Sequence, residues 1–285
     1  MKILIIGKDS YIGNHIDQWL SGKGWKVDQL DVLKDEWKSF DFSTYDALVH
    51  VAGIVHRPDC NDKDLYKRVN TDLPIQIAKK AKEQHVKTFL FLSTMAVFGM
   101  KKRLKKNVIT TDTKENPKGL YGASKRNAEI GLLNLQDKHF NIIIIRPPNV
   151  YGKGCKGGYI TGFLSVVRKL PVIPYAYNNV KQSMLFIDNL SELVKLAIQN
   201  NLNGILMPQD DRAVSANEIT RVMAIAIGKK PKTSVLLGLF VRLFHFIPLV
   251  NKAYGGLEYD MSLSQIEKID YVVKTFDEGM ALTIK

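Results

Sequence analysis

Tyr121 and Lys125 have the spacing of two side chains that share one face of a helix. An ammonium ion beside a phenol favours the phenolate, so the pair could serve as a general acid or base near neutral pH. Such a pair is common on surface helices and is weak evidence alone. Ser93 and Thr94 follow the apolar run 88–92, where a hydroxyl could hydrogen-bond a reacting oxygen. The candidate catalytic residues are therefore Tyr121, Lys125 and a hydroxyl of the Ser93-Thr94 pair.

A glycine-containing loop stands between a predicted strand at 3–6 and a predicted helix that runs through residue 20. A doubly wound fold presents backbone N–H groups and a helix N-terminus to a pyrophosphate at this point. Gly7 allows the tight turn, and Gly13 allows close packing of helix on strand. Ser10 stands where glycine is usual, and its hydroxyl could donate a hydrogen bond to the phosphates. The loop predicts a dinucleotide site contacted by Gly7, Ser10, Tyr11, Ile12 and Gly13.

Asp31 follows the second predicted strand, 26–30, and lies 24 residues after Gly7. A carboxylate in that place accepts hydrogen bonds from a ribose diol and repels a 2′-phosphate. The sequence therefore favours NAD over NADP, although the nearby Lys34 could soften this preference.

These side chains require a scaffold of strands and helices in alternation. Further apolar strands are expected at 47–51, 88–92 and 141–145, and helices at 72–84 and 124–138. Near-continuous apolar strands between helices indicate a parallel sheet that is covered on both faces. We predict an α/β fold with a doubly wound (Rossmann) parallel sheet and a small interleaved C-terminal portion. The expected division is 1–152 for the dinucleotide, with later segments returning to it, and 153–285 for the substrate.

Composition excludes several classes of protein. In 285 residues, 45% are hydrophobic and 24% are charged, which is typical of a globular chain. Cys60 and Cys155 are too few for a disulfide framework or a four-ligand zinc site, and no metal site is expected. No signal peptide is evident at the N-terminus, and no integral membrane span is expected. We expect a cytoplasmic protein.

The net charge of +13 indicates an anionic partner. Nucleic acid is not expected, because the basic residues lack interleaved stacking aromatics. The basic run 101–106 is interpreted as a solvated loop, with an overhang at the substrate mouth as the alternative. The apolar segment 235–250 is interrupted by Arg242, His245 and Pro248. It is interpreted as a helix packed on the C-terminal portion or on a dimer partner, with interfacial membrane attachment as the alternative.

Several ordered motifs together resemble the extended short-chain dehydrogenases/reductases of the nucleotide-sugar epimerase/dehydratase group. The resemblance is specific from residue 1 to about residue 188 and looser beyond. Besides the glycine loop and the Tyr-x-x-x-Lys pair, it rests on Asp41-Phe42, His50-Val51-Ala52-Gly53, Asn70-Thr71, Leu92-Ser93-Thr94-Met95-Ala96-Val97-Phe98-Gly99 and Arg146-Pro147-Pro148-Asn149-Val150-Tyr151-Gly152.

The resemblance implies a role for each matching residue. Tyr121 would be the acid and base, Lys125 its electrostatic partner and a ribose ligand, and Thr94 the hydroxyl that orients the substrate oxygen. The cofactor would be NAD, contacted in addition by Asp41, Phe42, Ala52, Gly53, Asn70, Pro147 and Pro148. The substrate would be a nucleotide-diphosphate sugar, with UDP favoured over dTDP, contacted by His56, Thr94, Asn149, Lys156, Gly157 and Gln182. A homodimer is possible.

The sequence also departs from the pattern of that group. Phe98 replaces a usual tyrosine, and Gly53 replaces a usual alanine. Gln182 stands where many members place a phosphate-binding arginine, so a bidentate anchor is missing. Three cations that could compensate are Lys156, Lys181 and Arg212. The acidic residue that marks many 4,6-dehydratases after the catalytic hydroxyl is not evident, which disfavours dehydration.

The resemblance leaves the reaction open. We expect 4-epimerisation of a UDP-hexose or UDP-N-acetylhexosamine through a 4-keto intermediate, with NAD retained throughout. The first alternative is a nucleotide-sugar 4-ketoreductase in deoxy amino sugar synthesis, since it needs the same three side chains. The second is a non-catalytic NAD-binding protein on the same fold.

Overall fold

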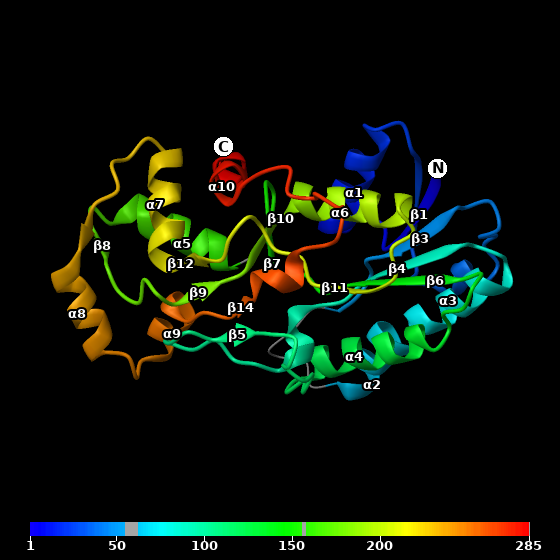
Figure 1. Cartoon of the computed structure of the whole chain (residues 1–285), viewed down its shortest axis with the longest axis horizontal. Helices are drawn as coiled ribbons and strands as arrows, with labels where there is room; N and C mark the ends of the chain where they lie inside the picture. The colour runs from blue at the N-terminus through cyan, green and yellow to red at the C-terminus, as the bar shows by residue number, and fades with distance from the viewer. Residues whose placement is uncertain (55–61, 156–157, 285) are drawn as a thin grey trace.

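A six-stranded parallel sheet lies at one end of the elongated molecule (Figure 1). The computed structural model describes residues 1–54, 62–155 and 158–284. The strand order is β11-β6-β4-β3-β1-β2. The strands are β1 (Lys2–Ile6), β2 (Lys26–Leu30), β3 (Ala47–His50), β4 (Thr88–Leu92), β6 (Asn141–Ile145) and β11 (Gly204–Leu206). This architecture confirms the predicted doubly wound α/β fold.

Both faces of the sheet are covered by helices, as the continuous apolar strands require. Along β1, Ile3 and Ile5 pack toward one face and Leu4 and Ile6 toward the other, in two separate hydrophobic clusters. Helices α1 (Tyr11–Ser21) and α6 (Ile187–Gln199) cover the first face, and α3 (Leu73–Glu83) and α4 (Leu120–Leu133) cover the second (Figure 1).

The strand order reverses at β1, which has β2 on one side and β3 on the other. The chain therefore leaves β1 toward one edge of the sheet and later returns on the opposite side. Such a switch point opens a crevice at the carboxyl ends of the strands, where this fold binds ligands. The link from β2 to β3 holds only a short 3-10 helix, η1 (Asp35–Lys38), and no further strand.

The other end of the molecule is built from short strand pairs and helices (Figure 1). The pairs are β7 (Asn149–Tyr151) with β10 (Met184–Phe186), β9 (Lys181–Gln182) with β12 (Val214–Ser215), β8 (Ile173–Pro174) with β13 (Thr233–Ser234), and β5 (Val108–Ile109) with β14 (Glu258–Tyr259). The helices are α5 (Gly158–Lys169), α7 (Ala216–Ala226), α8 (Val235–Leu243), α9 (Pro248–Tyr254) and α10 (Phe276–Ile284). Between them the chain re-enters the first unit as α6 and β11.

Predicted and observed boundaries differ most at α4. The helix expected at 124–138 begins at Leu120 instead, because Gly119 is extended (φ −131°, ψ 161°) and forms the N-cap. It ends at Leu133, and Asp137 then accepts backbone hydrogen bonds from His139 and Phe140 in a turn. Tyr121 and Lys125 therefore lie inside the first two turns of α4.

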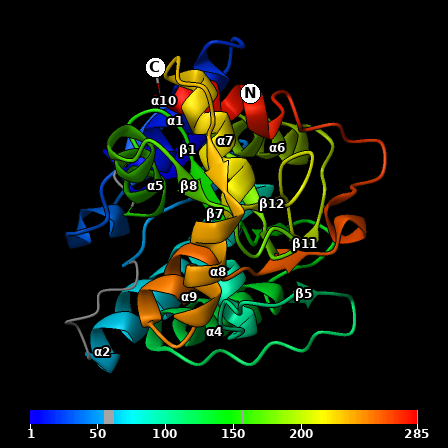
Figure 2. The same ribbon diagram turned by 90° about the vertical axis from the view of Figure 1, so that its left-hand side faces the viewer.

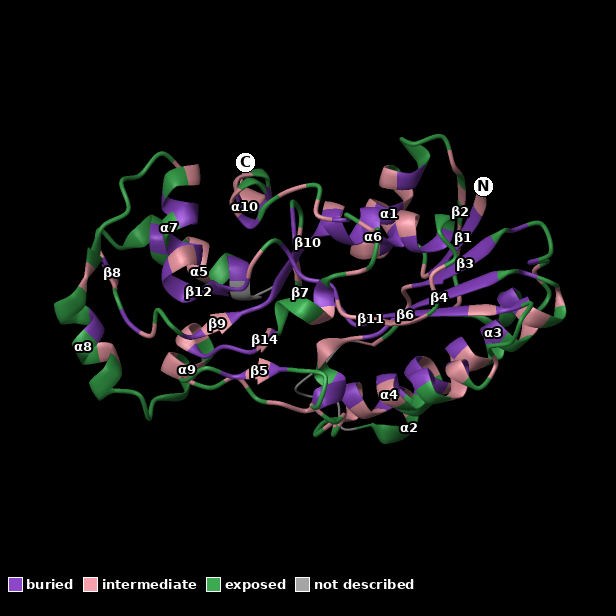
Figure 3. Ribbon diagram, in the orientation of Figure 1, coloured by how far each residue is buried: buried purple, intermediate pink, exposed green. Residues whose placement is uncertain are grey.

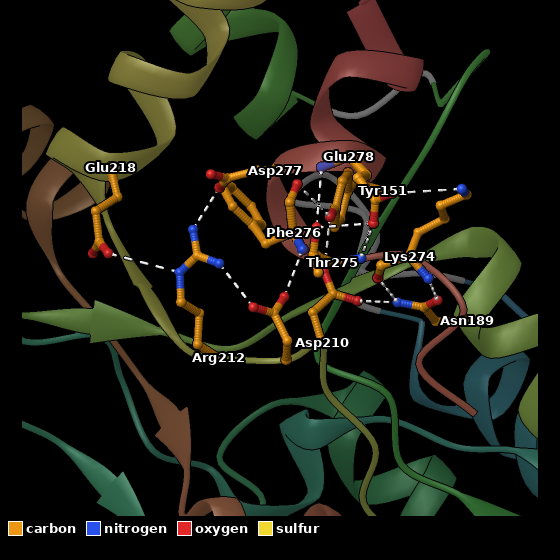
Figure 4. A network of polar contacts seen from close by, with 11 residues as sticks. Tyr151, Asn189, Asp210, Arg212, Glu218, Lys274, Thr275, Phe276, Asp277 and Glu278 are labelled. Atoms are coloured by element: carbon orange, nitrogen blue, oxygen red, sulfur yellow. Dashed lines mark hydrogen bonds and ion pairs between the residues drawn. The ribbon is translucent and has the colours of Figure 1, made fainter. Parts of the chain in front are cut away.

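A buried polar junction joins the two ends of the molecule (Figure 4). The Asp210 carboxylate accepts hydrogen bonds from the Tyr151 hydroxyl at 2.8 Å, the Phe186 N–H at 2.8 Å and the Asn189 side chain at 2.8 Å. Burial raises the pKa of Asp210 to about 7. Asn189 also donates to the Lys274 carbonyl, so the segment before α10 is attached at the same point. Within the described ranges, no helix combines the length and apolar character that crossing a bilayer requires.

Candidate active site

The glycine loop closes tightly against the end of β3. Gly7 has φ +123°, and a Cβ there would stand 2.8 Å from the Ala52 backbone nitrogen, so only glycine fits. Ser10 is the N-cap of α1, and its Oγ accepts a hydrogen bond from the Gly13 N–H at 3.1 Å. Its oxygen therefore caps the N-terminus of α1, whereas the sequence suggested a hydrogen bond to the phosphates. The N–H groups of Tyr11 and Ile12 lie in the first turn, which has no intrahelical acceptors for them.

Asp31 lies beside this loop, as predicted. The Leu30 carbonyl accepts hydrogen bonds from the N–H groups of Gly7 (3.0 Å) and Lys8 (3.3 Å), which joins the loop to the end of β2. The exposed Asp31 carboxylate accepts one hydrogen bond, from the Leu33 N–H at 2.8 Å. A cavity of about 900 Å³ opens next to it. Its lining includes Val32, Leu33, Trp37, Lys38, Ala52, Gly53, Ile54 and Arg68.

Asp41 and Phe42, which the resemblance places by the adenine, are not among the residues that line this cavity. Phe42 is fully buried in the core of the sheet, and Asp41 is exposed, where a hydrogen bond with Ser43 lowers its pKa. Trp37 and Lys38, from η1 in the link after β2, line the cavity.

Asn70 supports the loop after β3. Its side-chain oxygen accepts from the Ile54 N–H at 2.8 Å, and its side-chain nitrogen donates to the Ile54 carbonyl at 2.9 Å and to Ser124 Oγ at 3.1 Å. A Cβ on Gly53 would stand 3.1 Å from both Asn70 Oδ1 and Lys125 Nζ. Asn70 therefore fixes the loop, and Gly53 brings the cavity wall against Lys125.

Thr94 and Tyr121 meet as predicted. A Cβ on Gly122 would lie 2.6 Å from the Ala96 carbonyl oxygen, so this glycine lets α4 approach the 3-10 helix η3 (Met95–Phe98) that Thr94 caps. A hydrogen bond with the Thr94 side chain lowers the pKa of Tyr121, but burial is the larger effect and the pKa is raised overall. The expectation that Tyr121 has a pKa near neutrality is therefore wrong for this structure.

Lys125 is buried and turned toward the sheet. Its Nζ donates to the Leu92 carbonyl at 2.9 Å and lies 4.5 Å from the centre of the Phe91 ring. Burial lowers the pKa of Lys125 to about 7, and the Glu129 carboxylate opposes that change. The ammonium ion is thus held at the end of β4, beside Gly53, instead of at the Tyr121 phenol.

Glu129 is part of the site and was missed by the sequence analysis. It is fully buried, and its carboxylate accepts from Arg146 at 3.0 and 2.7 Å and from the Ser93 hydroxyl at 2.5 Å. It therefore fixes the residue before Thr94 and lies one helical turn after Lys125. That four-residue spacing after Lys125 was the available signal.

His50 is a second buried group near Lys125. Both of its ring nitrogens lack a hydrogen-bond partner among the described residues. Burial, together with the nearby charge of Lys125, lowers the pKa of His50 to about 3. Its ring is therefore neutral and packs between Phe89 and Phe91.

The predicted nicotinamide and sugar residues follow β6. The Pro147 carbonyl accepts from the Met95 N–H at 3.0 Å, so this segment lies against η3. Pro148 is half-buried, and Asn149 is exposed at the start of β7. His56, Lys156 and Gly157, which were also predicted to contact substrate, lie outside the described residues.

Gln182 is buried, and its side chain accepts a hydrogen bond from a lysine. Lys102 Nζ donates to Gln182 Oε1 at 2.7 Å. Burial lowers the pKa of Lys102 to about 8, so the amine remains mainly charged at neutral pH. Arg212, one of the predicted compensating cations, instead pairs with Asp277 and with Asp211 at 2.8 Å (Figure 4).

Four of the six residues in the basic run 101–106 are exposed, and the run is also hydrogen-bonded to neighbouring segments. The backbones of Arg103 and Gly256 exchange hydrogen bonds at 3.2 and 2.9 Å. The Asn251 side chain donates to the Lys102 carbonyl at 3.2 Å, and that of Asn107 donates to the Lys101 carbonyl at 3.0 Å. These contacts hold Lys102 over Gln182.

The residues present fit a dinucleotide. Gly7 packs closely against Ala52 at the switch point of the sheet. The α1 N-terminus, Asp31 and the cavity wall at Gly53 lie around this contact. The Tyr11 and Ile12 N–H groups would hold the pyrophosphate, Asp31 a ribose, and Lys125 the second ribose. This arrangement can position a dinucleotide beside the Thr94–Tyr121 pair.

The fold and this site define a dinucleotide-dependent enzyme of the extended short-chain dehydrogenase/reductase type. Residues 3–206 match the NAD dependent epimerase/dehydratase family. The chain belongs to this family, and its cofactor is NAD.

Three similar proteins illustrate the relationship. The chain is 28% identical over 288 residues to UDP-glucose 4-epimerase of Vibrio cholerae, covering 92% of this chain and 88% of that protein. It is 23% identical to the N-acetyl-alpha-D-glucosaminyl-diphospho-ditrans,octacis-undecaprenol 4-epimerase of Escherichia coli O157:H7, covering 80% and 73%. The structure resembles the Bordetella bronchiseptica enzyme WbmG in complex with NAD, with a TM-score of 0.72, 19% identity and coverage of 99% and 92%.

Proposed function

We propose that the protein is an NAD-dependent nucleotide-sugar 4-epimerase that acts on a UDP-hexose or UDP-N-acetylhexosamine. The observation that carries this proposal is the hydrogen bond between Thr94 and Tyr121, with the buried Lys125 on the same helix, against the cavity wall at Gly53. The Vibrio cholerae relative is named a UDP-glucose 4-epimerase, which supports both the reaction and the UDP group.

In this mechanism Tyr121 moves the proton. Its phenolate takes the proton of the C4 hydroxyl while the hydrogen at C4 leaves with its electron pair, which produces a C4 ketone. After the ketone presents its other face, that hydrogen returns with its electron pair and the Tyr121 phenol gives the proton back to oxygen. Bound NAD supplies the acceptor and later the donor of the hydride. The C4 configuration is thereby inverted without net oxidation.

Thr94 and Lys125 assist Tyr121 in this mechanism. The Thr94 hydroxyl stabilises the Tyr121 phenolate and orients the C4 oxygen, because it already shares a hydrogen bond with the phenol. Lys125 supplies positive charge beside Gly53 and a ribose contact. Glu129 favours the charged form of Lys125.

The sugar nucleotide would lie between the two ends of the molecule. Residues 1–152, with α6 and β11, would bind NAD, and most of 153–285 would bind the sugar nucleotide. Lys102 would contact the diphosphate and replace the cation that Gln182 lacks, since its charged amine is held on Gln182. Asn149, at the start of β7, would contact the sugar.

The experiment is turnover without added cofactor. An epimerase interconverts UDP-glucose and UDP-galactose, or their N-acetyl forms, with no NAD(P)H consumed. The alternative 4-ketoreductase would act only on a 4-keto sugar and would consume NAD(P)H stoichiometrically. That second result would overturn the proposed reaction while leaving the assigned residues in place.

A further inference from the structure

Helices α8 and α9 form a hairpin at the end of the molecule farthest from the sheet (Figures 1 and 2). Its outer side is strongly apolar. Among the described residues, half of the large hydrophobic side chains classed as exposed lie between 235 and 249, ten of twenty. Leu243, Phe246 and Leu249 are 65%, 70% and 69% exposed. Patches of this kind on a folded chain mark an interaction surface.

The hairpin contacts the rest of the chain through one side. Gly238 is the buried residue of α8, and a Cβ there would stand within 2 Å of the Tyr175 carbonyl oxygen. An apolar cavity of about 240 Å³ lies under the hairpin, between it and α5 and α7, and Val241 and Leu249 form part of its wall. Figure 3 shows most of the outer surface of α8 as exposed. Most of α8 is therefore not covered by the C-terminal portion, which leaves the dimer partner and the membrane as the two expectations for this segment.

The chain segment that contains the hairpin carries charge of one sign. The sequence contains no Asp or Glu from residue 219 to residue 257, a stretch that includes α8 and α9. The same stretch contains six basic residues, Arg221, Lys229, Lys230, Lys232, Arg242 and Lys252. The charge therefore complements an anionic surface. Two copies of this face would bring like charges together, which disfavours a symmetric dimer through it.

We infer that the α8–α9 hairpin docks on the surface of an anionic lipid bilayer. Its Leu and Phe side chains enter the interfacial region, and the surrounding lysines and arginines contact lipid phosphates. The hairpin lies in the plane of the interface and does not cross it. This inference rests on the exposed surface and does not depend on which sugar the active site turns over.

The test is co-sedimentation of the full chain with lipid vesicles. Wild-type protein should pellet with vesicles of equal parts phosphatidylcholine and phosphatidylglycerol, and much less with phosphatidylcholine alone. Substitution of Leu236→Ser, Leu243→Ser and Phe246→Ser together should lower the partition coefficient more than about tenfold. The matched control is Ile130→Ser with Ile225→Ser, two exposed apolar residues outside the hairpin, and it should bind like wild type.

A charge variant provides an independent second test. Lys230→Gln with Lys232→Gln should weaken binding to the anionic vesicles by roughly fivefold per lysine, without effect on neutral vesicles. All variants should keep the wild-type epimerase rate on a UDP-sugar, which separates this inference from the proposed function. The inference is overturned if wild type does not pellet with anionic vesicles, or if the serine variant and the lysine variant both bind like wild type. It is also overturned if the serine variant changes only a monomer–dimer equilibrium in sedimentation velocity.

Discussion

The side chains of Thr94 and Tyr121 share a hydrogen bond across the junction of η3 and α4. Thr94 Oγ1 also accepts from the Ala96 N–H at 3.1 Å, which fixes its position at the end of β4. The two effects on the pKa of Tyr121 oppose each other, since the hydrogen bond favours the phenolate and desolvation favours the phenol. The direction of each effect leads to two kinetic predictions.

Replacement of Tyr121 by Phe should lower kcat about a thousandfold, because it removes the group proposed to move the C4 proton. The ring is retained, so the NAD content of the purified protein, measured after denaturation, should stay at the wild-type level. An unchanged rate in Tyr121→Phe would remove Tyr121 from the mechanism.

Replacement of Thr94 by Val should shift the pH profile. The Thr94 hydrogen bond lowers the pKa of Tyr121, so its loss raises that pKa further. The rate of C4 oxidation requires the phenolate, and its rise with pH should therefore move to higher pH. The measurement is kcat against pH, with the exposed Thr110→Val as control. A profile that keeps its midpoint in Thr94→Val would contradict the assigned hydrogen bond.

Replacement of Lys102 by Ala should raise KM for the UDP-sugar about tenfold, since a charge-assisted contact to the diphosphate is lost. NAD content should not change. Lys105→Ala is the matched control, because Lys105 belongs to the same basic run and is exposed. Adding Gln182→Arg to Lys102→Ala should restore much of the affinity. Equal KM values for Lys102→Ala and Lys105→Ala would exclude Lys102 from the diphosphate site.

Asp210 should make stability depend on pH. Its pKa is higher in the folded chain, about 7, than its ordinary value of 3.8, so the folded state binds the proton more tightly between these values. The contribution of this group to the free energy of unfolding is at its maximum below about pH 3.8 and is lost as the pH rises through about 7. Denaturant unfolding of wild type and Asp210→Asn should show the difference, because Asn does not titrate. Parallel pH curves for the two proteins would refute this assignment.

Removal of the Asp210 side chain should destabilise the junction at every pH. Asp210→Ala leaves the Tyr151 hydroxyl, the Phe186 N–H and the Asn189 amide without their acceptor. We expect a loss of about 3 kcal/mol or more in unfolding free energy.

Much of the sheet could be predicted from the sequence. The predicted strands 26–30, 88–92 and 141–145 have the observed bounds of β2, β4 and β6. For β4 and β6 the signal is a run of apolar residues, because a parallel strand buried on both faces requires them. The start of α4 could not be predicted so closely, since it depends on how Gly119 is extended against the preceding segment.

The site was predicted less completely than the fold. Thr94 and Tyr121 meet because strand ends and helix starts converge at one edge of the sheet. The orientation of Lys125 toward Leu92, and the contact of Lys102 with Gln182, depend on packing between segments far apart in the chain. Within a run of similar basic residues, no local pattern distinguishes Lys102 from Lys101 or Lys105.

The fate of the hydrogen at C4 tests the central claim most directly. The purified protein should convert a UDP-hexose that carries deuterium at C4 into its C4 epimer with no cofactor added. Mass spectrometry and NMR should find the deuterium still at C4 of the product, because the hydride leaves and returns within one site. Loss of the deuterium to solvent, or product formation only when NADH or NADPH is supplied and consumed, would contradict the account.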